Sequence, residues 1–193
     1  MKKLAYCSVL VAVACLATVR PALGQEKDGG GGFLDWIHKL SGPSMLGPAA
    51  SYYWGFEGFR VRVAADLRFP VGFKDHTIEP DHSLNMLSLQ PSMEIPVNFL
   101  RIRDATPFEL NAGIGLHRLG GKGHDAVYHI SIPIYGQVRI PLGSQKAWFL
   151  RIGLGAHYFP SFSEEDFDGG IHVLTHGGEF TPGMILGIDY DRR

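Results

Sequence analysis

The sequence predicts an all-β fold, an antiparallel up-and-down transmembrane β-barrel, from three observations. Apolar and polar residues alternate along several long segments, as they do in two-faced β-strands. Aromatic residues recur ten positions apart on the apolar faces, and the polar faces carry arginine, carboxylates and glycine but no lysine. A chain of 193 residues with 25 glycines and 12 prolines also suits a single domain with many short connections.

Six segments show the alternation clearly, and two more show it weakly. Tyr128–Leu142 is the longest, with polar residues set against isoleucine, valine and leucine. The other clear segments are Phe59–Phe69, Leu89–Phe99, Phe108–Leu116, Trp148–Tyr158 and Phe180–Tyr190. The weaker candidates, which would raise the predicted number of strands from six to eight, are Gly47–Phe56 and Gly169–His176. Four prolines remove ladder hydrogen bonds, and bulges or strand ends are expected at Pro91, Pro96, Pro133 and Pro182.

The barrel is assigned to residues 45–193, and the first 44 residues are predicted to lie outside it. Residues 1–24 read as a secretory signal peptide, with Lys2 and Lys3 before an apolar run and a small-residue exit. Residues 25–44 are predicted to form a flexible lead and a short amphipathic helix. The helix is placed at Phe33–Leu40, because the apolar positions share one helical face. Both cysteines fall within the signal, so no disulfide is expected in the mature chain.

The spacing of the aromatic residues favours a barrel whose apolar face meets lipid. Ten strand steps cover about 33 Å, and a tilt near 45° reduces this to roughly 23 Å of height. That height matches the apolar band of about 25 Å between the aromatic girdles of an outer-membrane barrel. The predicted girdle residues are Phe59, Phe69, Trp148, Tyr158, Phe180 and Tyr190.

The polar faces are predicted to line the lumen and to fill it with ion pairs. Solvated strand faces usually carry lysine, whereas arginine suits confined sites because its planar guanidinium pairs with carboxylates. Glycines on the same faces, at 113, 115, 153, 155, 183 and 187, would make room for these side chains. The predicted lumen ion-pair network consists of Arg60, Arg62, Asp66, Arg68, Glu94, Glu109, Arg139, Arg151 and Asp189. An eight-stranded barrel is just filled by its side chains, which favours packed pairs over a pore.

On these patterns the chain resembles the small bacterial outer-membrane β-barrels, those of the OmpA-transmembrane and OmpX type, over about residues 45–193. The resemblance rests on the strand pattern and not on a sequence motif. It implies an even number of strands, usually eight, with long outer loops. It also implies a location in the outer membrane of a Gram-negative-type bacterium.

Three groups of residues could carry chemistry, and a simpler role is favoured for each. His129-Ile-Ser131 resembles the His-x-Ser of outer-membrane lipid A deacylases. However, His129 and Ser131 both fall at positions predicted to face the lumen, and Gly143 stands where a glutamate is expected. His172 and His176 have metal-ligand spacing only within a helix. Acidic residues at 164, 165, 166 and 168 could gather divalent cations. We therefore predict no catalytic residues, no metal site and no cofactor.

The sequence predicts a non-enzymatic outer-membrane protein with a structural or adhesive role, or with limited passage of small solutes. Its expected partners are outer-membrane lipid and lipopolysaccharide, and no protein partner can be named. No nucleic acid partner is expected, because 19 acidic residues oppose 18 basic ones even with the signal included. The alternatives are an outer-membrane lipid-modifying enzyme, a lipid A hydrolase or acyltransferase, and a secreted lipocalin-like ligand-binding barrel.

Overall fold

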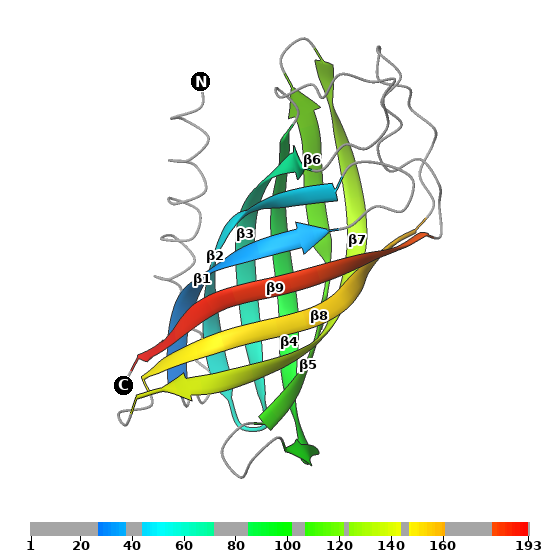
Figure 1. Cartoon of the computed structure of the whole chain (residues 1–193). Helices are drawn as coiled ribbons and strands as arrows, with labels where there is room; N and C mark the ends of the chain where they lie inside the picture. The colour runs from blue at the N-terminus through cyan, green and yellow to red at the C-terminus, as the bar shows by residue number, and fades with distance from the viewer. Residues whose placement is uncertain are drawn as a thin grey trace.

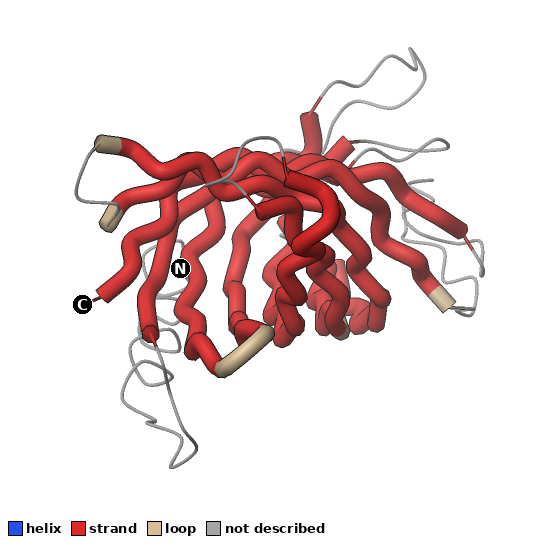
Figure 2. Tube along the Cα trace, turned by 90° about the horizontal axis from the view of Figure 1, so that it is seen from below, coloured by secondary structure: helices blue, strands red, loops and turns tan. Residues whose placement is uncertain are grey.

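The structure, a computed structural model, describes residues 27–37, 44–71, 85–101, 107–121, 124–143, 147–160 and 179–192. Within these ranges every regular element is a β-strand, as Figure 2 shows by its colouring. Among these residues no helix is long and apolar enough to cross a membrane. The all-β fold predicted from the sequence is confirmed.

The described residues form nine strands in chain order, each antiparallel to its partners. Their bounds are β1 Lys27–Ile37, β2 Ser44–Phe56, β3 Phe59–Val71, β4 Asn85–Arg101, β5 Pro107–Gly113, β6 Gly115–Gly121, β7 His124–Leu142, β8 Trp148–Phe159 and β9 Glu179–Arg192. The six clear predicted strands and the weaker candidate at Gly47–Phe56 are all present. The second weak candidate, Gly169–His176, lies outside the described residues.

Strands β5 and β6 are two parts of one continuous strand. Both pair with β4 on one side and with β7 on the other, in a register that continues across Ile114. The N–H of Ile114 donates to the carbonyl oxygen of Pro91 at 2.9 Å, but proline has no N–H to return the bond. With β5 and β6 counted together, the barrel has eight strands.

Pairing between the first and last strands closes the sheet. Each strand pairs with the next along the chain, and β1 also pairs with β9. Figure 1 shows this seam at the front of the barrel, where β1 in blue lies beside β9 in red. One end of the barrel, which we call the turn end, holds Lys27, Arg192, the turn at Glu57–Gly58 and the strand ends that flank residues 102–106 and 144–146. The strand ends that flank residues 38–43, 72–84, 122–123 and 161–178 lie at the opposite end, the loop end.

Proline disturbs the pairing less than predicted. Pro133 and Pro182 lie in continuous registers, so the bulges or strand ends expected there are wrong. A residue in an antiparallel pair bonds toward only one neighbouring strand, so a proline leaves the other ladder intact. Pro96 does precede a register shift, after Val97, and Pro91 interrupts the strand opposite it.

The barrel begins earlier than predicted. Residues 27–37, expected to form a flexible lead and the start of a helix, are strand β1, which pairs along its length with β2 and β9. Phe33, Asp35 and Ile37 are buried toward the lumen and Leu34 is exposed, so the segment is two-faced. Pairing on both edges overrides the low strand preference of glycine. Residues 38–40 of the predicted helix, and residues 1–24, lie outside the described residues.

Two glycines explain why a glycine run belongs in β1. A Cβ atom added at Gly29 would lie 2.6 Å from Cζ of Tyr53, and one at Gly31 would lie 3.1 Å from Cα of Asp189. Both glycines face the lumen, where these two larger side chains enter. The seam therefore needs residues without side chains at these positions, so that Tyr53 and Asp189 can pack in the interior.

The strands turn their polar side inward and their apolar side outward, the reverse of a water-soluble protein. Along β7, Ile130, Ile132 and Ile134 are 40–48% exposed, while His129 and Ser131 are buried. The exposed apolar side chains lie on β1 and on β4 to β9, and a wall of this kind is unfavourable in water and suits contact with lipid.

Candidate functional site

The inward side chains form three layers between the two ends of the barrel. A charged network occupies the turn end, a mainly apolar layer the middle, and a polar cluster the loop end. We call the first the turn-end network. It joins four arginines to four carboxylates, and its members are Arg60, Arg62, Arg139, Arg151, Glu94, Glu109, Asp189 and Asp191. Its formal charges balance.

Arg62 lies at the centre of the turn-end network. Its Nε donates to Oε1 of Glu94 at 2.6 Å, and its Nη2 donates to Oδ2 of Asp189 at 2.8 Å. Its Nη1 donates to Oγ of Ser51 at 2.7 Å, and the guanidinium carbon lies 4.7 Å from the ring centre of Tyr53. The site uses each nitrogen of the guanidinium fork, which the single ammonium of lysine does not provide.

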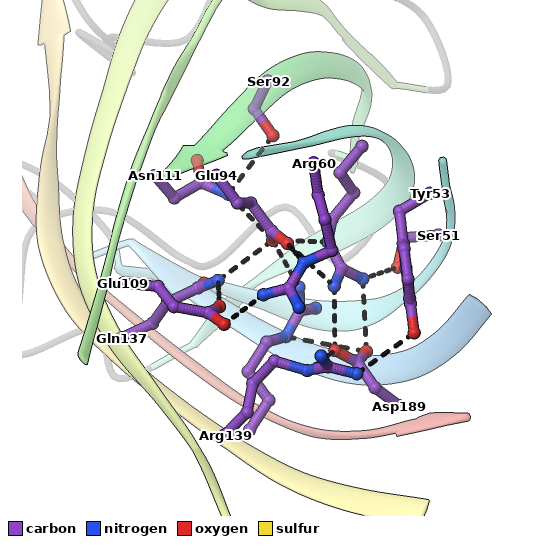
Figure 3. A network of polar contacts seen from close by, with 12 residues as sticks. Ser51, Tyr53, Arg60, Ser92, Glu94, Glu109, Asn111, Gln137, Arg139 and Asp189 are labelled. Carbon is purple, nitrogen blue, oxygen red and sulfur yellow. Dashed lines mark hydrogen bonds and ion pairs between the residues drawn. The ribbon is translucent and has the colours of Figure 1, made fainter. Parts of the chain in front are cut away.

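Glu94 and Glu109 are held together by two donors, as Figure 3 shows. Arg60 pairs with both carboxylates, through Nε to Oε2 of Glu94 at 3.0 Å and through Nη2 to Glu109. The Nε2 of Gln137 donates to both carboxylates at 3.0 Å. Two nearby carboxylates would repel each other, and these shared donors compensate for that repulsion.

Arg139 links the network to the last strand. Its guanidinium lies 3.2 Å from Oδ2 of Asp189 and 2.5 Å from Oδ1 of Asp191. Its Nη2 also donates to the hydroxyl of Tyr53 at 3.1 Å, and that hydroxyl donates to Asp191. Sequence reasoning missed Asp191 and Tyr53. Both residues occupy positions of their strands that face inward. Asp191, however, follows the end of the predicted strand, and Tyr53 lies in a weakly predicted strand.

The middle layer separates the turn-end network from the loop end. Its buried members are Phe33, Ala49, Ala64, Tyr135 and Ile185. A cavity of about 20 Å³ borders this layer and is lined in part by Arg62, Arg151, Asp35 and Gln90. A cavity of this size holds about one water molecule, far less than a solute path needs.

The loop-end cluster contains two carboxylates that share the same donors. The Nη2 of Arg68 donates to Oδ2 of Asp35 at 2.6 Å and to Oδ2 of Asp66 at 3.0 Å. The Nε2 of Gln90 approaches the same two oxygens, at 3.3 Å and 2.6 Å. All four side chains are buried. Asp35 was missed because its segment was predicted to be helical.

A hydrogen-bonded chain of buried side chains adjoins this cluster. Oγ of Ser131 lies 2.7 Å from Nε2 of His117 and 3.0 Å from Nδ1 of His157. The other ring nitrogen of His117 lies 2.8 Å from Oγ of Ser88, and that of His157 lies 2.8 Å from the hydroxyl of Tyr135. The chain thus runs from β4 through β6, β7 and β8. Sequence reasoning missed the two histidines, although both have the inward phase.

All nine residues predicted for the lumen network face the interior, and each takes part in an ion pair. They do not form one network, however. Asp66 and Arg68 pair with Asp35 at the loop end, and the other seven belong to the turn-end network. The apolar middle layer accounts for this separation.

The predicted chemistry candidates have different surroundings from those expected. Ser131 contacts His117 and His157, and His129 lies opposite His117 in the β6–β7 ladder. Ser131 is fully buried on the lumen side of the wall. Residues 164–168 and 172–176 lie outside the described residues. Within the described ranges no group of three or more His, Cys, Asp or Glu side chains could hold a metal ion.

The predicted girdle residues lie at two levels on the outer face. Trp148 lies opposite Tyr190 near the turn end, and Tyr158 lies opposite Phe180 near the loop end. Their ring centres are 4.8 Å and 4.9 Å apart, respectively. On β3 the remaining two residues fall at the two strand ends, Phe59 at the turn end and Phe69 toward the loop end. The aromatic side chains therefore mark both limits of the apolar wall.

A closed antiparallel barrel of eight strands, with an apolar outer wall and a charged lumen, is the fold of the small outer-membrane β-barrels. The solved structure of neisserial surface protein A matches 85% of this chain and 95% of that chain, with a TM-score of 0.55 and 12% identity. Ail, the attachment invasion locus protein of Yersinia pestis, matches 88% of this chain and 99% of its own, with a TM-score of 0.45 and 11% identity. No protein-family model and no curated protein matches the sequence. The predicted barrel fold of the OmpA and OmpX type is confirmed by the eight-stranded structure and by its similarity to neisserial surface protein A.

Proposed function

We propose that this chain is an outer-membrane β-barrel that is closed to solutes and has a structural or adhesive role at its loop end. The observation that carries the proposal is the turn-end network, in which buried arginines and carboxylates pair across the lumen. An eight-stranded barrel has just enough interior for its side chains. A protein with a filled lumen acts through its outer surfaces, and the strand ends that flank the longest connections, 72–84 and 161–178, lie at the loop end.

The outer wall supports the membrane location. Trp148 and Tyr158 are ten residues apart on β8, which corresponds to roughly 23 Å of height for a strand tilted near 45°. Between them Leu154 is 65% exposed, an unfavourable position in water and a favourable one in lipid. In this arrangement the turn end faces the periplasm and the loop end faces outward, where lipopolysaccharide is the expected neighbour.

The other candidate functions have less support from the lumen. Passage of small solutes needs a continuous water path, whereas the cavity beside Arg151 holds about one water molecule. A lipocalin-like protein needs a roomy, apolar interior. A lipid-modifying enzyme needs a nucleophile that an acyl chain reaches, and Ser131 is fully buried behind the wall.

Conductance measurements test the closed lumen. Purified protein inserted into planar bilayers should show no steady current, and Arg62→Ala should introduce a leak because it opens the centre of the network. The control is Arg118→Ala, which removes an exposed arginine and should stay silent. A steady, large current through the wild-type protein would show that water fills the lumen.

Cell fractionation tests the membrane location separately. The protein should be found with the outer membrane, require detergent for extraction and migrate faster on gels before heating than after it. Recovery in the soluble periplasmic or secreted fraction would favour the ligand-binding barrel instead.

A further inference from the structure

The two charged groups of the lumen differ in their balance. The turn-end network has four arginines for four carboxylates, but the loop-end cluster has only Arg68 for Asp35 and Asp66. Both of these carboxylates are buried, and so is the arginine. An unpaired charge in such a place is costly unless a proton or a cation neutralises it.

The contacts show where the imbalance lies. Oδ2 of Asp35 and Oδ2 of Asp66 converge on one nitrogen of Arg68 and on the amide of Gln90. Their Oδ1 atoms are buried, and neither has a hydrogen-bond partner. Two carboxylates that share their donors in this way stay together most easily when one proton lies between them.

Arg62 and Arg151 line the same small cavity as Asp35, but both already pair with Glu94 and Asp189. Among the described residues, the remaining candidates for a second cation beside the carboxylate pair are histidines. The inward polar side chains that face it are Ser88 on β4, His117 on β6, Ser131 and Tyr135 on β7, and His157 on β8. On β2 the inward residues Met45, Gly47 and Ala49 are uncharged, and on β9 Thr181 and Gly183 are uncharged. The choice for the neutralising proton is therefore between a carboxyl group and an imidazole.

The hydrogen-bonded chain favours the carboxyl group. All four ring nitrogens of His117 and His157 lie against hydroxyl oxygens, at 2.7–3.0 Å from those of Ser88, Ser131 and Tyr135. A buried imidazolium is costly unless a carboxylate pairs with it, and these rings contact hydroxyl groups instead. Hydroxyl groups can both donate and accept, so a neutral ring can donate from one nitrogen and accept at the other. These contacts favour neutral imidazoles and leave the proton to the carboxyl group.

We propose that the loop-end cluster is a buried proton-binding site, in which Asp35 and Asp66 share one proton and His117 and His157 stay neutral. The proposal does not depend on whether the lumen conducts. A protonated carboxyl leaves one carboxylate for Arg68, so the loop end becomes balanced like the turn end. The ligand is a proton in exchange with water, and a small monovalent cation at the same place is the competing outcome.

Asparagine substitutions distinguish the two charged groups. Asn mimics a protonated carboxyl, so Asp35→Asn and Asp66→Asn should melt at or above the wild-type temperature in detergent. The control Asp189→Asn removes a carboxylate from the balanced network and should melt lower.

Spectroscopy detects the proton directly. Infrared spectra of the wild-type barrel in mildly acidic buffer should show the carbonyl stretch of a buried protonated carboxyl. That band should disappear in Asp35→Asn, where Asp66 pairs with Arg68 alone, and should remain in Asp189→Asn. Nitrogen NMR of the histidine rings should show neutral forms for His117 and His157.

Three results would overturn the proposal. The first is the absence of the carboxyl band from the wild-type protein, which needs no variant to fold. The second is imidazolium signals from His117 or His157 in the same buffer. The third is a wild-type melting temperature that follows sodium concentration at fixed pH, which would assign the site to a metal cation.

Discussion

At the scale of single residues, the interior depends on arginine because each guanidinium serves several partners. Arg62 donates to two carboxylates and a hydroxyl and stacks on Tyr53. A buried ion pair is not strongly stabilising in itself, because desolvation offsets the attraction. Removing one partner is a different matter, because the remaining charges stay buried without compensation.

Arg62→Ala should therefore be strongly destabilising. We expect a loss of about 3–5 kcal/mol in the free energy of unfolding, measured by denaturant titration in detergent or lipid. Arg118→Ala removes an exposed arginine and should cost no more than about 1 kcal/mol. Equal losses in the two variants would mean that the network is hydrated.

The phase of alternation predicted the inward residues, but it did not predict how they group. Every residue of the predicted network faces the lumen, because a strand of period two fixes the side of each position. The division into two clusters depends on how far each strand is shifted against its neighbours, and the sequence does not contain that register. Asp35 escaped prediction because Phe33–Leu40 also fits a helical face.

At the scale of elements, the glycines of β8 make room for the side chains of β7. A Cβ atom at Gly155 would lie 2.7 Å from the backbone Cα of Tyr135, a contact that side-chain movement cannot relieve. At Gly153 the nearest atom would be Cβ of Gln137 at 3.3 Å. The two positions lie on the same strand and the same face, but Gly153 has more room for an added methyl group than Gly155.

Gly155→Ala should destabilise the barrel by about 1–3 kcal/mol, because the added methyl group displaces the β7 backbone. Gly153→Ala should change the stability by less than about 1 kcal/mol, since a small shift accommodates it. Urea unfolding of both variants gives the comparison. A large loss at Gly153 with none at Gly155 would contradict the strand packing described above.

The position of β8 in the membrane can be tested by charge. Leu154 lies midway between the aromatic levels at Trp148 and Tyr158 and is 65% exposed. Leu154→Arg should cost about 2–4 kcal/mol, because it places a charge near the bilayer midplane. Tyr128, which is 72% exposed, lies on β7 beyond the loop-end aromatic level, and Tyr128→Arg should cost only about 0–1 kcal/mol. Equal costs at both positions, measured by refolding into lipid vesicles, would contradict a lipid-facing wall.

At the scale of the whole molecule, the fold could be predicted because a barrel wall repeats one simple pattern. Alternation in Trp148–Tyr158 and the similar segments predicted seven of the eight strands, and the side that each residue faces, almost without reference to individual contacts. The closing strand could not be predicted in this way. Gly29–Gly32 has low strand preference, and only pairing with both β2 and β9 makes it a strand.

The same topology predicts which end of the molecule is reached from outside the cell. Both described chain ends and the turn at Glu57–Gly58 share the turn end, and the strand ends that flank the two longest connections, 72–84 and 161–178, share the loop end. In outer-membrane barrels short turns face the periplasm and longer loops face outward. Lys122, between β6 and β7, is therefore expected outside, and Glu57, between β2 and β3, inside.

Cysteine labelling on intact cells tests this orientation. The predicted mature chain has no cysteine, so Lys122→Cys and Glu57→Cys each introduce a single thiol. An impermeant maleimide should label residue 122 on intact cells and residue 57 only after the outer membrane is permeabilised. Glu57 is exposed in its turn, so burial does not explain a lack of labelling there. Labelling at 57 but not at 122 on intact cells would invert the orientation, and with it the assignment of the proton-binding cluster to the outer half of the barrel.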